Sequence, residues 1–187
     1  MVNKPKDPQP RLNREEWLEK AIEVLSREGS GKLRVQGLSE ALGVSKGSFY
    51  WHFKDRAEFL RAIVEFWSER YTKKVITAAE ASGAEGLECL RMVLEWVTGE
   101  DLSGYDATFD AWAAHEPDIL PLVREVHGLR HDFVERQFSA MGYSGRELAL
   151  RTQAFMGYMK YRSQHSLSWD SLKDPGGLED QLEFFTK

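Results

Sequence analysis

Apolar residues recur at helical spacing along nearly the whole chain, and this periodicity limits the possible folds more than any other feature. The first such stripe consists of Trp17, Leu18, Ala21, Ile22 and Leu25. These residues share one face of a helix that is expected to end at Gly29. No segment alternates apolar and polar residues as a half-buried strand would. The sequence therefore predicts an all-α protein.

Capping residues and glycines locate the expected helices. Asn13 followed by Glu16 is close to a capping box. Asp55 followed by Glu58 repeats the pattern at the start of a fourth helix, which is expected to continue for many turns. Short second and third helices precede it. Later helices are expected over residues 87–97, 109–113, 117–142, 144–168 and 178–185.

The segment around Gly43 has the residues that a tight helix-turn-helix requires. Gly43 can adopt the left-handed φ of the turn without steric cost, and Val44 can fill the angle between the two helices. Phe49 and Phe53 are one turn apart, so they define the inner face of the second helix. Trp51 is therefore expected to point away from the core.

The outer surface of this second helix suits a docked DNA duplex. Lysines there can neutralise phosphates, and the N–H groups at the start of the helix can hold one. The polar residues one helix earlier can reach base edges or backbone. The DNA contacts expected on these grounds are Arg34, Gln36, Ser45, Lys46, Gly47, Tyr50 and Lys54. The alternative is a solvated bundle surface on which Trp51 packs against a neighbouring helix.

The formal charge is distributed unevenly along the chain. The whole protein carries −5, but residues 1–56 contain 11 Lys/Arg against 8 Asp/Glu, whereas residues 57–187 contain 14 against 22. A basic head on an acidic body fits a protein that meets phosphate at one end only.

The segment Leu42–Arg56, which reads LGVSKGSFYWHFKDR, resembles the DNA-binding head of the TetR family of tetracycline-repressor-like regulators. That family has a Gly-Val-Ser turn, a recognition helix ending in a Tyr-x-His-Phe box, and a Lys/Arg-rich start to the fourth helix. The resemblance implies DNA contacts from Lys46, Gly47, Ser48, Tyr50, Trp51 and His52, and backbone contacts from Lys54 and Arg56. One departure is Lys32–Gln36, because a Thr is commoner in the family at the head of the second helix.

The resemblance also implies how the chain is organised. Residues 11–56 are expected to form a helix-turn-helix DNA-binding domain, and residues 57–187 a larger helical domain for ligand binding and dimerisation. The implied function is a ligand-responsive transcriptional regulator, a repressor that binds a palindromic operator as a homodimer and is released by a small molecule. The alternative is a helical small-molecule-binding protein whose head binds no DNA specifically.

Other classes of function lack a signal in the sequence. No HExxH, P-loop, G-x-S-x-G or Rossmann glycine pattern occurs, so neither an enzyme nor a cofactor is expected. No apolar stretch approaches the roughly 20 residues of a membrane helix, and no secretory signal is evident. A cytoplasmic protein without a membrane partner is expected. Cys89 is the only cysteine, which excludes an internal disulfide.

Aromatic residues in the second part of the chain exceed what a small bundle needs, and they predict an apolar ligand pocket between helices. Its expected lining is Phe66, Trp96, Phe109, Trp112, His115, Phe133 and Met156. Each aromatic residue taken singly is better explained as plain core, and only the group as a whole predicts the pocket. An acidic body with aromatic walls favours a cationic or neutral aromatic ligand.

Two further patterns concern metals and assembly. His127 and His131 lie four residues apart, with Glu135 a turn further on, but no third ligand is evident, so a solvated helix face and no metal site are predicted. The last two helices carry more apolar surface than one subunit can bury, which predicts a homodimer through them. The residues concerned are Leu148, Leu150, Ala154, Phe155, Tyr158, Met159, Leu182 and Phe185.

Overall fold

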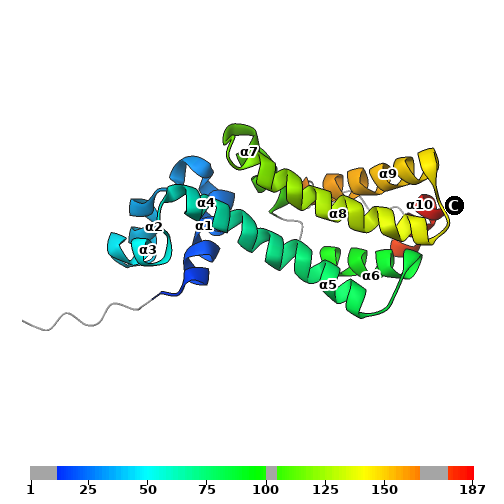
Figure 1. Ribbon diagram of the computed structural model, residues 1–187, viewed down its shortest axis with the longest axis horizontal. Coiled ribbons are helices and arrows are strands. Elements are labelled where there is room, and N and C mark those ends of the chain that lie inside the picture. Colours follow the sequence, from blue (N-terminus) through cyan, green and yellow to red (C-terminus); the bar gives the residue numbers. More distant parts are fainter. Residues whose placement is uncertain (1–11, 100–104, 165–176) are drawn as a thin grey trace, which may run out of the picture. The chain divides into compact units, whose positions relative to one another are not determined.

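The computed structural model describes residues 12–99, 105–164 and 177–187. Throughout these residues the regular structure is helical and no strand occurs, as predicted (Figure 1). Residue 11 and the predicted extension of one helix to residue 168 lie outside the described residues. The chain divides into two compact units, the first ending at Phe66 and the second beginning at Trp67. This division falls inside the fourth helix, whereas the boundary expected from sequence lies at its start.

The first unit holds the predicted N-terminal helices. They are α1 (Arg14–Glu28), the 3₁₀ turn η1 (Ser30–Lys32), α2 (Val35–Ala41), α3 (Lys46–His52) and most of α4 (Arg56–Ser68). Both predicted caps are confirmed. The Glu16 backbone N–H donates to Asn13 Oδ1 at 2.9 Å, while the Asn13 N–H donates to Glu16 Oε2 at 2.6 Å. The Glu58 N–H donates to Asp55 Oδ1 at 2.8 Å.

An aromatic cluster around Phe49 forms the core of the first unit. The distance between ring centroids is 5.6 Å from Phe49 to Trp17 of α1, 5.2 Å from Phe49 to Phe53, and 5.1 Å from Phe49 to Phe59 of α4. All four side chains are buried. The Trp17 and Phe59 contacts are edge-on, an arrangement that aromatic pairs prefer. The inner face of α3 therefore anchors this helix to α1 and α4.

The second unit contains the remaining helices. They are η2 (Glu69–Lys73), α5 (Lys74–Ala81), α6 (Gly86–Gly99), α7 (Asp106–His115), α8 (Leu120–Ala140), α9 (Gly145–Gln164) and α10 (Leu178–Thr186). α8 packs against α6, α7 and α9, and α10 packs against α6 and α9. η2 is a π-helical turn that interrupts the predicted long fourth helix. A single wide turn hardly changes the apolar periodicity, so the sequence pattern did not reveal it.

The core of this unit corrects the predicted dimer surface. Phe155, Leu182 and Phe185 are buried inside the subunit, and the Phe155 ring lies 5.9 Å from Phe138 and 5.4 Å from Phe185. These residues are covered because α10 folds back onto α6 and α9. They cannot supply the outer surface that the sequence pattern suggested.

Arg151 of α9 holds the end of α10. Its Nη1 donates to the Phe185 carbonyl at 2.6 Å, and its guanidinium carbon lies 4.2 Å from the centroid of the Tyr143 ring. The Tyr143 hydroxyl donates to the Thr186 carbonyl. Carbonyl groups at a helix C-terminus lack intrahelical partners, so these donors stabilise the docked helix.

Candidate nucleic-acid interface and internal cavity

Backbone hydrogen bonds around Gly43 close the turn between α2 and α3. Gly43 has a φ of 67°, a left-handed value that glycine adopts without penalty. The Gly43 N–H donates to the Glu40 carbonyl at 3.1 Å, and the Val44 N–H donates to the Ser39 carbonyl at 2.9 Å. Val44 is half-buried at this turn. The helix-turn-helix is present, with α3 as its second helix.

α3 buries one face and exposes the other. Phe49 and Phe53 point into the core, whereas Trp51 is 85% exposed and Tyr50 is 62% exposed. The orientation predicted for Trp51 is therefore confirmed, and the alternative of packing against a neighbouring helix is wrong. Water solvates an indole ring poorly, so two adjacent exposed aromatic residues favour a binding surface.

Polar and cationic groups extend this surface beyond α3. The exposed ones are Arg34, Ser45, Lys46, Gly47, Lys54 and Arg56, and Ser48 is half-buried. Ser45 occupies the N-cap position of α3, but its side chain makes no capping hydrogen bond. Arg34 occupies the N-cap position of α2, also without a side-chain cap. Neither Arg34 nor Ser45 therefore uses its side chain to cap a helix.

Two predicted contact residues hold their polar atoms against the protein itself. The Gln36 amide accepts a hydrogen bond from Lys46 Nζ at 3.2 Å and donates one to Glu40 Oε1 at 3.0 Å. His52 is half-buried, and its Nε2 donates to the Leu12 carbonyl at 2.8 Å. Gln36 therefore links α2 to the start of α3, and His52 ties the end of α3 to the residues before α1.

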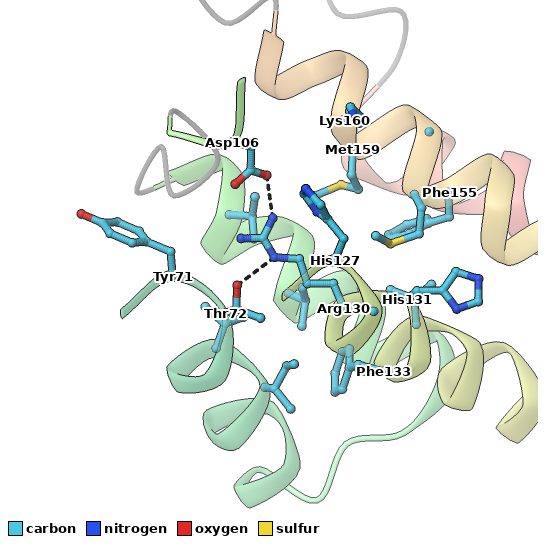
Figure 2. Close-up of a pocket in the computed structure, with 18 of the residues that line it drawn as sticks. Tyr71, Thr72, Asp106, His127, Arg130, His131, Phe133, Phe155, Met159 and Lys160 are labelled. Atoms are coloured by element: carbon cyan, nitrogen blue, oxygen red, sulfur yellow. Dashed lines mark hydrogen bonds and ion pairs between the residues drawn. The ribbon is translucent and has the colours of Figure 1, made fainter. Parts of the chain in front are cut away.

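A cavity of about 570 Å³ lies within the second unit (Figure 2). This volume is in the range of small-molecule sites, which is about 300–1,000 Å³. Most of its lining is apolar and comes from α5, α6, α8 and α9: Val75, Ile76, Val93, Val97, Phe133, Val134, Phe155, Met156 and Met159. The π-helical turn η2 adds Tyr71 and Thr72. π-helical turns occur frequently at functional sites, which agrees with this position.

Arg130 of α8 organises one group of polar atoms at the cavity. Its Nε donates to Thr72 Oγ1 at 2.8 Å, and its Nη1 donates to Asp106 Oδ2 at 2.6 Å, as Figure 2 shows. Its guanidinium carbon lies 5.1 Å from the centroid of the Trp67 ring. Arg130 therefore connects η2, α7 and α8 through contacts that are largely shielded from water.

Asp110 of α7 organises a second group. His127 Nε2 lies 2.8 Å from Asp110 Oδ1, and Lys160 Nζ lies 2.9 Å from Asp110 Oδ2. Burial raises the pKa of Asp110, but the hydrogen bonds and positive charges of His127 and Lys160 outweigh burial and hold the pKa below its usual value. The expectation that His127 lies on a solvated helix face is wrong, because α7 packs over α8 at this point.

The sequence of the first unit agrees with one known family. The model of the bacterial regulatory proteins of the tetR family matches residues 18–63, which include all of α2 and α3. These are the helices that form the turn at Gly43 and the exposed surface around Trp51.

These residues carry the DNA-binding domain of the TetR family.

Individual relatives agree with this assignment. The HTH-type transcriptional regulator TtgR of Pseudomonas putida is 25% identical over 100 residues, which cover 54% of this chain and 47% of TtgR. The class D tetracycline repressor protein of Escherichia coli is 32% identical over 72 residues, which cover 38% of this chain and 33% of the repressor. The chain thus matches less than half of the length of either relative. A transcriptional regulator from Rhodococcus has the same fold over 94% of both chains, with a TM-score of 0.72 and 16% identity.

The lining of the cavity differs from the set of residues expected from the sequence. Phe133 and Met156 line it, whereas Phe66, Trp96, Phe109, Trp112 and His115 do not. Phe109 stacks on Trp67 with ring centroids 4.1 Å apart, and Trp112 is buried 5.9 Å from Phe109. Sequence reasoning missed Thr72, Arg130 and Lys160. The spacing of Asp106 and Asp110, four residues apart on an otherwise small and apolar helix, is a signal that could have pointed to their partners.

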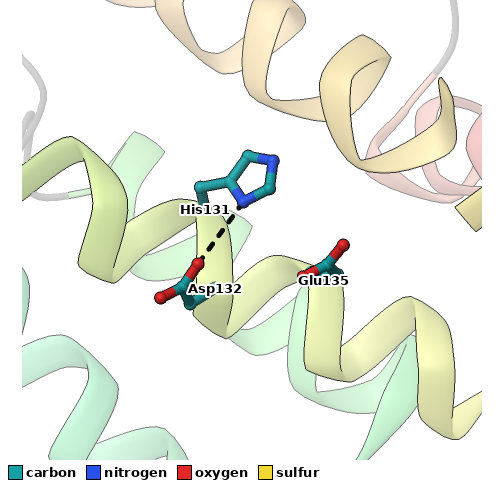
Figure 3. Close-up of side chains that lie close together, drawn as sticks. All are labelled: His131, Asp132 and Glu135. Atoms are coloured by element: carbon teal, nitrogen blue, oxygen red, sulfur yellow. Dashed lines mark ion pairs between the residues drawn. The ribbon is translucent and has the colours of Figure 1, made fainter. Parts of the chain in front are cut away.

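His131, Asp132 and Glu135 form a separate cluster on α8 (Figure 3). One ligand atom from each lies within 4.8 Å of the others, and His131 Nδ1 is 3.6 Å from Asp132 Oδ1. His131 and Asp132 are exposed, so water screens their charges. The local ion pair accounts for the grouping, and we assign no metal to it. Among the residues that the structure describes, no helix is long and apolar enough to cross a membrane.

Proposed function

We propose that this chain is a ligand-responsive DNA-binding transcriptional regulator of the cytoplasm. It represses by occupying a palindromic operator as a homodimer, and a small molecule in the cavity releases it. The exposed Trp51 on a helix anchored by buried Phe49 is the observation that carries the DNA-binding part. The cavity of about 570 Å³ supports the ligand response.

In this proposal α3 enters the major groove, which is wide enough to admit an α-helix. Tyr50 and Trp51 meet base edges, thymine methyl groups and the groove wall. Lys46 and Lys54, which are exposed, meet the phosphates on either side. Arg34, Gln36, Ser45, Gly47, Ser48, His52 and Arg56 complete the proposed surface. The two heads of a dimer would read half-sites about 34 Å apart.

The deciding experiment is selection of bound sequences from random DNA duplexes, followed by a screen for compounds that reverse binding. A palindromic sequence enriched over several rounds is the expected result. Tight small-molecule binding without any enriched sequence would favour the alternative, a helical ligand-binding protein whose head reads no DNA.

Lys54→Ala should weaken binding to the selected operator and to random DNA by similar factors. A phosphate contact carries no sequence information, and its loss should reduce the slope of log K against log salt by roughly one unit. The measurement is a salt titration of binding to both duplexes by fluorescence anisotropy. Lys74→Ala is the matched control, because Lys74 is also exposed but belongs to the second unit. A loss confined to the operator would contradict the phosphate role.

The proposed dimer rests on a stripe along α9. Leu150, Ala154, Gly157 and Tyr161 are all exposed, and their spacing places them on one face of the helix. The side chain of Leu150 is 54% exposed. Small residues between two large apolar ones allow another helix to approach closely, so this stripe is a suitable surface for a second copy.

Leu150→Glu should convert the homodimer to monomers, because a carboxylate would be buried without a partner in the interface. Size-exclusion chromatography with light scattering at micromolar concentration is the measurement. Thr77→Glu, an exposed position on α5, adds the same charge and should leave the dimer intact. A parent protein that is itself monomeric under these conditions would rule out the proposed assembly.

The ligand response requires that a ligand bound in the cavity favours one of two arrangements of the DNA-binding domains in the dimer. The chain runs from α3 through α4 into η2, which lines the cavity through Tyr71 and Thr72. A ligand that rearranges η2 would bias the helix that leads back to α3. Its effect on operator affinity is limited to its differential affinity for the two states.

A further inference from the structure

We infer that the cavity binds a neutral, mostly apolar molecule that donates hydrogen bonds from hydroxyl or N–H groups to Asp106 and Asp110. The inference rests on the proposed function only in treating this cavity as the effector site. It follows from two carboxylate oxygens of α7 that are buried without enough hydrogen-bond donors from the protein.

Asp106 uses one of its two oxygens within the part of the chain that the structure describes. Oδ2 accepts the hydrogen bond from Arg130 Nη1 at 2.6 Å, whereas Oδ1 is buried and has no hydrogen-bond partner. Figure 2 shows the carboxylate of Asp106 joined to Arg130 through one oxygen. A buried carboxylate oxygen without a donor is costly and rare in native proteins. Because Asp106 lines the cavity, a ligand can supply the missing donor.

Asp110 offers a second acceptor, four residues further along α7. Residues four apart are neighbours on a helix surface, so both aspartates lie on one side of α7. Asp110 Oδ1 lies 2.8 Å from His127 Nε2. Oδ2 is buried, and beyond the ion pair with Lys160, 2.9 Å away, it accepts no well-directed hydrogen bond among the described residues. Since each carboxylate oxygen has two lone pairs, Oδ2 can accept a donor from a ligand without losing Lys160.

With neutral imidazoles, the charged groups at the cavity wall sum to zero. Arg130 is paired with Asp106 and Lys160 with Asp110, which makes two positive and two negative charges. A cationic ligand would add an uncompensated charge to a mostly apolar cavity, and protonation of His127 would only increase this excess. An anionic ligand would bring further acceptors to oxygens that need donors. A neutral molecule with donor groups meets neither obstacle.

The rest of the wall requires an apolar body with donors placed along it. Polar and apolar side chains are intermixed: Val75 follows Thr72, and Phe133 follows Arg130, each within about one helical turn. The ring of Phe133 and the thioether of Met156 favour contact with a flat aromatic body. Of the two ligand classes expected from the sequence, cationic and neutral aromatic, the cavity therefore favours the neutral one.

The test compares three neutral probes that share one naphthalene ring: naphthalene-2,7-diol, 7-methoxy-2-naphthol and 2,7-dimethoxynaphthalene. Calorimetry with the full chain should give the diol an affinity about tenfold higher than the diether, because hydrogen bonds to a carboxylate are the stronger kind. The mono-ether, with a single donor, should fall between them. If no acceptor were available, burying hydroxyl groups would be unfavourable, and the diether would bind most tightly. Equal or tighter binding of the diether, or no binding of the diol at about 1 mM, would overturn the inference.

Two charged probes with the same ring test whether the ligand is neutral. Both 2-naphthoate and 2-naphthylmethylammonium should bind more weakly than the diol, the first because the carboxylates repel it and the second because it adds an uncompensated positive charge. Tighter binding of 2-naphthoate would contradict the need for donors, and tighter binding of the ammonium would contradict the neutral class.

Substitution of each aspartate by asparagine locates the acceptors. Asp106→Asn and Asp110→Asn should each lower the ratio of diol to diether affinity about threefold or more, because an amide oxygen is a weaker acceptor than a carboxylate. The diether has no donor, so its affinity should stay nearly constant and show that the cavity is intact. Asp106→Asn also removes the partner of Arg130, so Asp110→Asn, whose side chain is 24% exposed, decides if the first variant does not fold.

Asp118→Asn is the matched control for both variants. Asp118 is exposed and does not line the cavity, so its substitution should leave the ratio of diol to diether affinity unchanged. An unchanged ratio in every folded variant of Asp106 and Asp110 would contradict the proposed acceptors.

The same measurements separate this inference from the proposed function. Probe binding by calorimetry requires no DNA. A chain that binds the diol as described but selects no operator would leave the inference standing and remove the regulatory role. A chain that selects an operator but prefers the diether would do the reverse.

Discussion

Trp51→Ala is expected to cost on the order of 1–3 kcal/mol in binding to the selected operator, and much less on random duplex DNA. The indole is 85% exposed, so its removal leaves the core of the first unit intact. The ratio of specific to non-specific affinity should therefore fall about tenfold to hundredfold while the thermal midpoint stays nearly constant. Competition binding with both duplexes, together with a melting curve, measures the two quantities.

The conservative variant Trp51→Phe is the matched control for this prediction. It retains an aromatic face that can contact thymine methyl groups and sugars, so it should recover part of the lost specificity. A Trp51→Ala protein that melts many degrees lower but keeps its operator preference would show that the indole stabilises the fold instead of reading DNA.

Phe49→Ala is expected to produce the largest loss of stability, about 3–5 kcal/mol. Phe49 is fully buried and its ring contacts Trp17, Phe53 and Phe59, so truncation opens a cavity among three helices. Total stabilities of domains are only about 5–15 kcal/mol, so the first unit should be partly unfolded near its working temperature. Circular dichroism melting and urea titration measure the effect, and operator binding should be lost with it.

Tyr50→Ala provides the comparison for Phe49, one position along the same helix. Tyr50 is 62% exposed and meets the Phe49 ring only at its edge, so its truncation should cost about 1 kcal/mol or less in stability. Similar melting temperatures for Phe49→Ala and the parent protein would show that α3 is not anchored through this ring.

Much of the first unit was predictable because its signals are local. Asn13 with Glu16, and Asp55 with Glu58, satisfy backbone groups within one turn, so the caps require no tertiary partner. Gly43 supplies a left-handed turn that few other residues accept. The periodicity of Phe49 and Phe53 fixes the direction of Trp51 once α3 is a helix.

The cavity was not predictable in the same way. Helical periodicity identifies the apolar face of α7 but not whether that face meets a neighbouring side chain or an empty space. Phe109 and Trp112 pack into the core because α7 lies over Trp67, whereas Phe133 and Met156 of α8 and α9 face the cavity. The predicted dimer surface was wrong for the same reason. Periodicity could not show that α10 covers Phe155 within the subunit.

The amino-acid sequence by itself determined the helices, their caps, the helix-turn-helix and the exposed face of α3, since all of these depend on contacts within a few residues. Only the tertiary structure decided which apolar residues form the core, which line the cavity, and which charges meet there. Thr72, Asp106 and Arg130 are far apart in the chain, yet two hydrogen bonds join them. Such pairs form because packing of helices in three dimensions excludes water around them, and no periodicity within one helix encodes that packing.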